Sequence, residues 1–187
     1  DKVKDLEDFL YAKHVHERNK HIKDSVNEED SEGSGMSVEW ANDILDKYTG
    51  TQIEKIAQTF QKNIVKKRLN LLLKNGFISQ KLYDKLEKRW QNYVPLKGKP
   101  GISKYIQMLQ GGFNVSGSDI KVAGGRKGVR ADNVIIQSVA DLSETIIRIE
   151  KNKVLLSLAK LIRENPSKIW KIKRPKYNFV KPIWDDD

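Results

Sequence analysis

The chain has 187 residues, a mass of 21.5 kDa and a net charge of +10 at pH 7. Charged residues make up 32% of it and hydrophobic residues 38%, a balance that favours long amphipathic helices over a compact α/β enzyme. The lack of cysteine excludes disulfide bonds, thiol catalysis and the usual zinc sites, and no apolar stretch is long and uncharged enough to predict a membrane span.

The first 48 residues predict two helices joined by a loop. The first helix spans residues 3–23 and repeats side chains at helical spacing on one face. That face consists of Leu6, Phe9, Leu10, His14 and Arg18. Residues 24–37 are polar, acidic and contain glycine, so we expect a mobile loop there. Ser37 then caps a second helix over residues 38–48. Its inward side chains are Trp40, Ile44 and Leu45.

Two further helices follow at short intervals. The Thr-Gln-Ile-Glu sequence of residues 51–54 is a capping-box pattern, which begins a helix that runs to Asn75. Gly76 is a natural stop for it. The expected inner face consists of Ile53, Ile56, Phe60, Ile64 and Leu71. Ser79 caps the next helix, which reaches about residue 91. It turns Leu82, Leu86 and Trp90 inward, and the short connections make neighbouring helices antiparallel.

The regular pattern is lost over residues 96–131, which hold eight of the 12 glycines. We expect a glycine-rich, basic crossover in this stretch. The longest helix opens at Asp132 and ends before Asn165-Pro166. Its first half carries apolar residues at alternating spacings of four and three, as a packing seam requires. They are Ile135, Val139, Leu142, Ile146 and Ile149, after which the stripe changes phase to Leu155, Leu158 and Ile162.

Together these elements predict an all-α, or nearly all-α, fold. Residues 1–95 are expected to form an N-terminal helical group and residues 96–131 the crossover. Residues 132–165 then pack back on the group as a long helix. Residues 166–187 mix lysine with aromatic side chains and two prolines, so we expect an extended docking arm.

The charge is distributed unevenly, with a net of −4 over residues 1–37 and +14 over residues 38–187. Such basic runs indicate a polyanionic partner, and non-specific DNA is the first candidate. Lysine-rich surfaces are, however, also common in proteins of AT-rich genomes. The candidate nucleic-acid-binding residues are Lys97, Lys99, Arg126, Lys127 and Arg130.

Three side chains on one face of the first helix, His14, Glu17 and His21, invite a metal-site interpretation. The two histidines are seven residues apart, about 10.5 Å along a helix axis, which is too far for one ion with bonds of about 2 Å. We therefore expect neither a metal nor a cofactor. Instead, His14 should pack or hydrogen-bond on the inner face while Glu17 and Arg18 order the chain locally.

The other candidate sites also have simple structural interpretations. Residues 124–128, Gly-Gly-Arg-Lys-Gly, lack the spacing of a nucleotide-binding loop, so they serve either as a non-specific phosphate contact or only as a turn. Asp141 and Glu144 are expected to be solvated surface rather than an acid–base pair. The tail aromatics can stack on single-stranded bases or anchor a protein interface, and we favour the interface. They are Trp170, Tyr177, Phe179 and Trp184.

Four short blocks combine residues in ways that helix packing does not require. They are Tyr11-Ala12-Lys13-His14 with Glu17-Arg18-Asn19, then Gly33-Ser34-Gly35-Met36, Tyr93-Val94-Pro95-Leu96-Lys97-Gly98, and Ile147-Arg148-Ile149-Glu150-Lys151-Asn152-Lys153-Val154. Between and after them stand Gly76-Phe77-Ile78, Gly112-Phe113-Asn114-Val115, Gly125-Arg126-Lys127 and Asn165-Pro166 with Trp170. In this order, over most of residues 9–170, the chain resembles the large polyvalent protein-associated domains, which are modules of very large phage and mobile-element proteins.

The resemblance implies a context rather than a reaction. The proteins that carry such modules travel in the virion and enter the host with the DNA, and they include relatives of antirestriction proteins. No catalytic residue is carried over to this chain. A chain that begins with Asp1 rather than Met fits this context, as a processed product or a section of a longer polypeptide. The acidic residues 28–30, ahead of the second block, depart from the family's pattern.

We expect structural roles for the residues of the first, third and fourth blocks, and we expect the last three of them to hold the turn at residues 93–98. They are Tyr11, His14, Glu17, Arg18, Tyr93, Pro95, Arg148, Glu150 and Lys151.

The resulting expectation is a non-enzymatic structural and interaction module of a phage virion cargo protein. It would lie in the virion interior and, after injection, in the host cytoplasm. Its expected partners are other phage virion proteins or further copies of itself, together with packaged DNA. The alternative is a DNA-binding antirestriction factor that protects injected DNA, with an affinity that falls steeply with salt. A hydrolase or nuclease would need a clustered acidic or metal site.

Overall fold

The computed structural model describes residues 1–25, 34–96 and 133–170. Helices take up 78% of these residues and no strand occurs among them, which confirms the predicted all-α class. Contacts divide the chain into two units, residues 1–149 and residues 150–187. The first half of the long helix therefore groups with the N-terminal helices.

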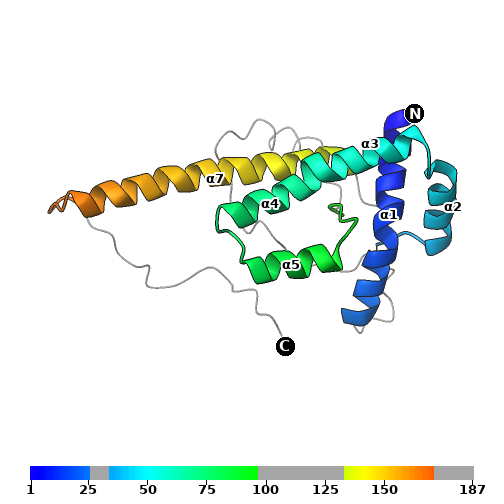
Figure 1. Cartoon of the computed structure of the whole chain (residues 1–187), viewed down its shortest axis with the longest axis horizontal. Coiled ribbons are helices and arrows are strands. Elements are labelled where there is room, and N and C mark those ends of the chain that lie inside the picture. The colour runs from blue at the N-terminus through cyan, green and yellow to red at the C-terminus, as the bar shows by residue number, and fades with distance from the viewer. Residues whose placement is uncertain (26–33, 97–132, 171–187) are drawn as a thin grey trace. The chain divides into compact units, whose positions relative to one another are not determined.

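Helix α1, Lys2–Ser25, is the central element of the first unit. The sequence predicts one buried face, but four consecutive residues, Phe9 to Ala12, are all at most 1% exposed, and Val15 is fully buried. A helix that is apolar on every side in this way must be surrounded by other elements. Helices α2 and α3 pack against it (Figure 1).

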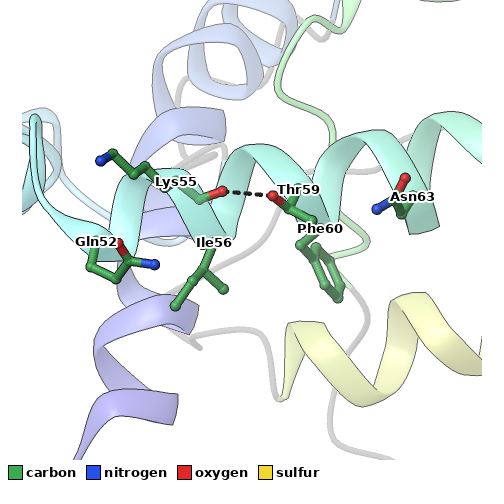
Figure 2. Close-up of a pocket in the computed structure, with 6 residues that line it drawn as sticks. All are labelled: Gln52, Lys55, Ile56, Thr59, Phe60 and Asn63. Carbon is green, nitrogen blue, oxygen red and sulfur yellow. Dashed lines mark hydrogen bonds between the residues drawn. The ribbon is translucent and has the colours of Figure 1, made fainter.

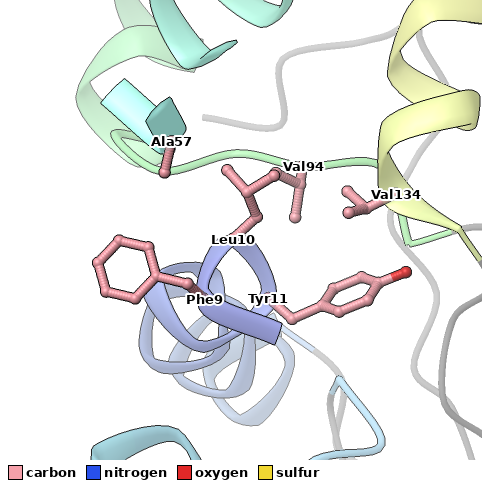
Figure 3. Packing of buried hydrophobic residues seen from close by; sticks show 6 residues of the cluster. All are labelled: Phe9, Leu10, Tyr11, Ala57, Val94 and Val134. Carbon is pink, nitrogen blue, oxygen red and sulfur yellow. The ribbon is translucent and has the colours of Figure 1, made fainter. Parts of the chain in front are cut away.

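The largest buried cluster joins α1 to three other parts of the chain. Phe9, Leu10 and Tyr11 of α1 meet Ala57, Val94 and Val134 in it (Figure 3). These residues come from segments more than 30 positions apart in the sequence, so the cluster connects helices that have no local reason to meet. Burial of such side chains stabilises a fold by roughly 1.5–3 kcal/mol each.

Helix α2, Val38–Tyr48, begins as predicted at Ser37, whose hydroxyl accepts a hydrogen bond from the amide of Trp40 at 3.1 Å. Ala41 is its fully buried residue and packs with Ala12 and Val15 of α1. The three larger side chains predicted to point inward are half-buried at the edge of this contact: Trp40, Ile44 and Leu45. A small residue at the centre lets the two helix backbones approach closely.

The next helical run consists of α3, Gln52–Phe60, the π-helical segment η1, Gln61–Lys66, and α4, Lys67–Lys74. Thr51 caps it by accepting from the amide of Ile53 at 3.2 Å. The carboxylate of Glu54 accepts from the amide of Gly50 at 2.8 Å. Thr51 is thus the predicted cap, but the two reciprocal bonds of a capping box are not formed. Its hydroxyl accepts from the second rather than the third helical residue, and Glu54 reaches Gly50 instead of Thr51.

The π-helical segment changes which residues face the core. A π turn closes its hydrogen bonds from i to i+5, so each residue advances the helix by less than in an α-helix. The face of Ala57 consequently returns at Leu72, which is fully buried, while the predicted Leu71 is half-buried. Ile56, also predicted to be inward, is 41% exposed. The prediction from sequence assumed an uninterrupted α-helix, and this assumption was wrong.

Gly76 ends this run as predicted, with a positive φ of 72°. The amide of Phe77 donates to the carbonyl of Leu72, and the amide of Gly76 donates to the carbonyl of Leu73. These two bonds form a Schellman motif, in which the position after the cap requires left-handed backbone.

Helix α5, Gln80–Arg89, starts at the predicted cap Ser79, whose hydroxyl accepts from the amide of Leu82 at 3.2 Å. It lies beside α4 (Figure 1), and the hydroxyl of Tyr83 donates to the side-chain carbonyl of Asn70 at 2.6 Å. After α5 the chain turns back to the central helix, where Val94 and Pro95 are buried.

The long helix α7, Val134–Glu164, begins two residues later than the predicted opening at residue 132. Asn133 caps it, because the Asn133 side-chain carbonyl accepts from the amide of Ile136 at 3.0 Å. In the predicted apolar seam, Leu142 and Ile149 are buried, and Ile135 is half-buried against the core cluster. Val139 and Ile146, expected in the same seam, are 39% and 42% exposed.

Half of the buried residues of α7 in the first unit are polar. Gln137, Ser138, Asp141 and Thr145 are each at most 6% exposed, and they are buried beside Val134, Ala140, Leu142 and Ile149. Asp141, which the sequence analysis assigned to solvated surface, is therefore a buried residue. Its burial is possible only because other elements supply polar partners, which are described below.

In the part of the chain that the structure describes, no helix is both long enough and apolar enough to cross a membrane.

Candidate functional site

Three of the four sequence blocks meet at the second half of α1, in a cluster that we call the α1 junction. It consists of His14, Glu17 and Asn19 on α1, residues 34–36 and residues 90–93, of which Tyr93 begins the third block. Glu17 and Asn19 follow His14 by three and five residues. All three side chains therefore lie around the part of the helix that faces later segments of the chain. Each of them contacts a segment that lies far away in the sequence.

Asn19 connects α1 to the second block. Its amide nitrogen donates to the carbonyl of Met36 at 3.1 Å, and its carbonyl oxygen accepts from the amide of Ser34 at 2.8 Å. Ser34 is fully buried, so its backbone N–H would lose its hydrogen bond without Asn19. A carboxamide both donates and accepts, which a carboxylate or an ammonium at this position would not do.

Glu17 connects α1 to Asn92, the residue directly before the third block. Its two carboxylate oxygens accept from the backbone amide of Asn92 at 3.1 and 3.2 Å, and one of them also accepts from the Asn92 side chain at 3.0 Å. Hydrogen bonds to an ionised acceptor are about twice as strong as neutral ones. The start of the turn is therefore fixed to α1 by charge-assisted bonds.

His14 and His21 both pack against Trp90. The ring centroids of His14 and Trp90 lie 5.3 Å apart, those of His21 and Trp90 lie 4.9 Å apart, and His14 also meets Tyr93 edge-on at 5.6 Å. A shared aromatic partner explains why the two histidines lie on one face of α1. Across residues 1–25, 34–96 and 133–170 no group of three or more potential ligands could hold a metal ion.

Burial controls the protonation of this cluster. It lowers the pKa of His14. Glu17, whose Oε2 lies 3.5 Å from His14 Nδ1, partly opposes this by raising that pKa. Burial alone would raise the pKa of the Glu17 carboxyl, but hydrogen bonds from His14 and Asn92 outweigh it and hold that pKa below its ordinary value. The junction therefore favours a neutral imidazole beside an ionised carboxylate.

A second polar group, which we call the polar layer, surrounds the Tyr93 phenol with Arg18, Arg68, Asp141 and Thr145. Burial raises the pKa of this phenol, and the nearby charges of Arg68, Asp141 and Arg18 act on it as well. Arg68 also donates from Nε to the Thr145 hydroxyl at 3.1 Å. The layer joins α1, α4, the third block and α7.

Sequence reasoning missed three of the five residues of this layer. Arg68 and Thr145 lie in helices that were analysed mainly for their apolar residues, and Asp141 was assigned to solvated surface. A usable signal was present, because Gln137, Asp141 and Thr145 recur at intervals of four on one face of an otherwise apolar helix. Polar residues at helical spacing predict a buried polar contact as directly as apolar ones predict a core.

The predicted structural residues are placed as follows. Tyr11, His14, Arg18 and Pro95 are buried, and Tyr93, Glu17, Arg148 and Lys151 are half-buried. Glu150 is exposed and forms an ion pair with Lys153 at 2.7 Å. The turn is held on one side by Glu17 and on another by Gln61, whose side chain donates to the carbonyl of Tyr93 at 2.9 Å. A contribution of Arg148, Glu150 and Lys151 to this turn stays a prediction.

Most of the proposed partner-binding residues lie outside the described residues. This applies to all five nucleic-acid candidates and to three of the four tail aromatics, namely Lys97, Lys99, Arg126, Lys127, Arg130, Tyr177, Phe179 and Trp184. The Gly-Gly-Arg-Lys-Gly loop at residues 124–128 also lies outside them. Trp170 is described, and it is 46% exposed while its indole N–H donates to the carbonyl of Asn165 at 3.3 Å.

Two surface hollows were absent from the sequence analysis. The first, of about 350 Å³, is lined by one helical run alone (Figure 2), where Ile56 and Phe60 lie among four polar side chains. The second, of about 320 Å³, lies between α1, the π-helical segment and residues 91–92. Its lining residues are Lys13, Ala57, Gln58, Gln61, Lys62, Lys66, Gln91 and Asn92.

Comparisons with known proteins return no match, whether with family models, with curated proteins or with solved structures.

Replacing Asn19 by alanine should destabilise the first unit by about 1–3 kcal/mol, since the buried amide of Ser34 loses its acceptor. The measurement is urea unfolding followed by circular dichroism. Asn42→Ala is the matched control, because Asn42 is exposed and its side chain meets only the exposed ring of His16, at 3.1 Å. Equal effects of the two substitutions would contradict the role assigned to Asn19.

Acid should destabilise the protein through His14. In the folded protein the pKa of His14 lies below the ordinary histidine value of 6.5. As the pH falls through 6.5, the unfolded chain therefore binds more protons than the folded one. The free energy of unfolding decreases until the pH reaches the folded-state pKa. Its slope is at most about 1.4 kcal/mol per pH unit for one histidine. His14→Phe keeps an aromatic ring beside Trp90 and should flatten the dependence between pH 7 and pH 5. If the stability of the wild type instead increased as the pH falls from 7 to 5, the assignment would be contradicted.

Proposed function

We propose that this chain is a non-enzymatic protein-interaction module. The observation that carries the proposal is an apolar stripe on α7 within the second unit, formed by Val154, Leu155, Leu158 and Leu161. These side chains are 67%, 62%, 49% and 50% exposed. Exposed apolar residues that are contiguous, rather than scattered singly, are typical of protein-binding surfaces.

The helical spacing makes the stripe continuous. Val154, Leu158 and Leu161 stand at i, i+4 and i+7, which is the spacing of one helix face. Lys153, Lys160 and Glu164 flank it, and Lys160 pairs with Glu164 at 3.7 Å. A second copy of α7 offers the same stripe with the same coiled-coil spacing, so pairing of two copies is the simplest arrangement that covers these residues.

The first unit supports the interaction role in a different way. Its α1 junction and polar layer connect α1, α4, the third block and α7 through hydrogen bonds and charges. Such a network holds side chains and turns in fixed positions. A firmly held base from which a helix extends beyond residue 149 suits a module that joins other proteins.

The biological context of the proposal rests on the resemblance to the large polyvalent protein-associated domains. In that context the module belongs to a phage virion cargo protein, lies in the virion interior, and reaches the host cytoplasm after injection. Its partners are other virion proteins or copies of itself. The net charge of +10 supports an additional contact with packaged DNA, and the same contact would serve an antirestriction factor that protects injected DNA.

Self-association should depend on the stripe. Sedimentation velocity of the full chain should show association that Leu158→Glu abolishes, because a buried carboxylate opposite an apolar face is costly. Leu156→Glu is the matched control. Leu156 lies on the same helix and is 61% exposed, but it stands two residues, about 200° of rotation, away from Leu158. A wild-type chain that remains monomeric at every concentration would exclude a second copy as the partner.

Lysine-specific cross-linking in the native particle tests the virion context. Peptides of this chain should be found in purified virions, with cross-links from Lys153 or Lys160 to another virion protein or to a second copy. Both side chains are exposed and flank the stripe. Finding the chain only outside particles would contradict the cargo proposal and favour the antirestriction alternative.

A further inference from the structure

The hollow between α1, the π-helical segment and residues 91–92 is rich in lysine. Three of its eight lining residues are lysines, namely Lys13, Lys62 and Lys66, and four are glutamine or asparagine. None of these eight residues carries a carboxylate. Its volume of about 320 Å³ is at the lower end of the range of small-molecule sites.

We propose that this hollow binds phosphate groups, and that it is the place where the chain contacts the nucleic-acid backbone. Lysine ammoniums attract phosphate, and carboxamide N–H groups donate hydrogen bonds to its oxygens. The inference rests on the DNA contact in the proposed function and gives it a location outside the sequence-predicted basic loop.

The lysines occupy the hollow because of the local backbone. Gln61 and Lys66 are five residues apart, the separation that backbone hydrogen bonds span in a π-helix, and both line the hollow together with Lys62. In a regular α-helix the residue aligned with Gln61 would be closer to Val65, an apolar residue. The π-helical segment therefore places a cation where the usual helix would place an isopropyl group.

Two of the residues that line the hollow are held in place before any ligand binds. The side chain of Gln61 donates to the carbonyl of Tyr93 at 2.9 Å, and Glu17 holds both the backbone and the side chain of Asn92. The Lys13 ammonium lies 5.7 Å from the centroid of the Phe9 ring, a cation–π distance that restrains it. A site whose donors are already positioned loses less conformational entropy when it binds.

The accessibility of the lysines favours a polymer backbone over a small anion. Lys62 and Lys66 are exposed at the rim, while Lys13 is half-buried. The two rim ammoniums can therefore reach neighbouring phosphates of a chain that passes over the hollow. The carboxylate of Glu17 lies behind Asn92, where its oxygens accept hydrogen bonds, and it is not among the lining residues.

The test compares two double variants of the full chain that lose the same net charge. Lys62→Gln with Lys66→Gln removes the two rim cations, and Lys74→Gln with Lys88→Gln removes two exposed lysines of α4 and α5 that do not line the hollow. Binding to a fluorescent DNA duplex is measured by anisotropy between about 50 mM and 200 mM salt. Unchanged circular dichroism and melting temperature establish that both variants fold.

The proposal predicts that the first variant binds DNA about tenfold more weakly and loses roughly two from the slope of log affinity against log salt. The second variant should lose at most about threefold, from its smaller net charge. Equal losses in the two variants would overturn the assignment to the hollow and indicate diffuse charge.

A second probe, tripolyphosphate, separates failure of the phosphate site from failure of the DNA contact. A wild type that does not bind DNA overturns the DNA contact. The phosphate site then survives only if tripolyphosphate raises the melting temperature of the wild type and the Lys74/Lys88 variant but not that of the Lys62/Lys66 variant. If tripolyphosphate has no such selective effect either, the phosphate site is overturned as well.

Discussion

Burial of α1 on almost every side is the constraint on which the first unit depends. A polar side chain in that position must find a partner, because an unpaired buried polar group costs about 1–3 kcal/mol. Glu17 and Asn19 find theirs in segments 75 and 15 residues away in the sequence. The central helix therefore organises the chain twice, through its apolar side chains and through its polar ones.

The α1 junction also connects the interior to the surface. Asn92 is held by Glu17 through hydrogen bonds and also lines the hollow that we propose to bind phosphate. Gln61 has the same double role, since it holds the Tyr93 carbonyl and lines the hollow. The first block thus contributes both Glu17, which fixes Asn92, and Lys13, which lines the hollow.

Helix α7 buries polar and apolar side chains together. In the first unit Gln137, Asp141 and Thr145 are buried beside Leu142 and Ile149, while Val139 and Ile146 are exposed. In the second unit Leu155, Leu158 and Leu161 are exposed as well. Because part of its buried face is polar, the Arg68–Thr145 hydrogen bond and the charges around Tyr93 add to its apolar contacts. The exposed apolar residues remain available for the protein partner that we propose.

The sequence by itself determined the helical class, the positions of the helices to within about two residues, and the caps at Ser37, Thr51, Ser79 and Gly76. These features depend on interactions within one turn of helix, so local spacing encodes them. The resemblance of the four blocks indicated that residues such as His14, Glu17 and Tyr93 matter, but it did not say what they contact.

Only the tertiary structure decided which side chains meet. The pairing of Glu17 with Asn92, the packing of His14 and His21 on Trp90, and the burial of Asp141 all join residues that no local rule relates. The π-helical segment is a further case, because it shifts the buried face from Leu71 to Leu72 and brings Lys66 to the hollow. Such i to i+5 turns are rare within helices, so a prediction from sequence assumes the regular α-helical pattern.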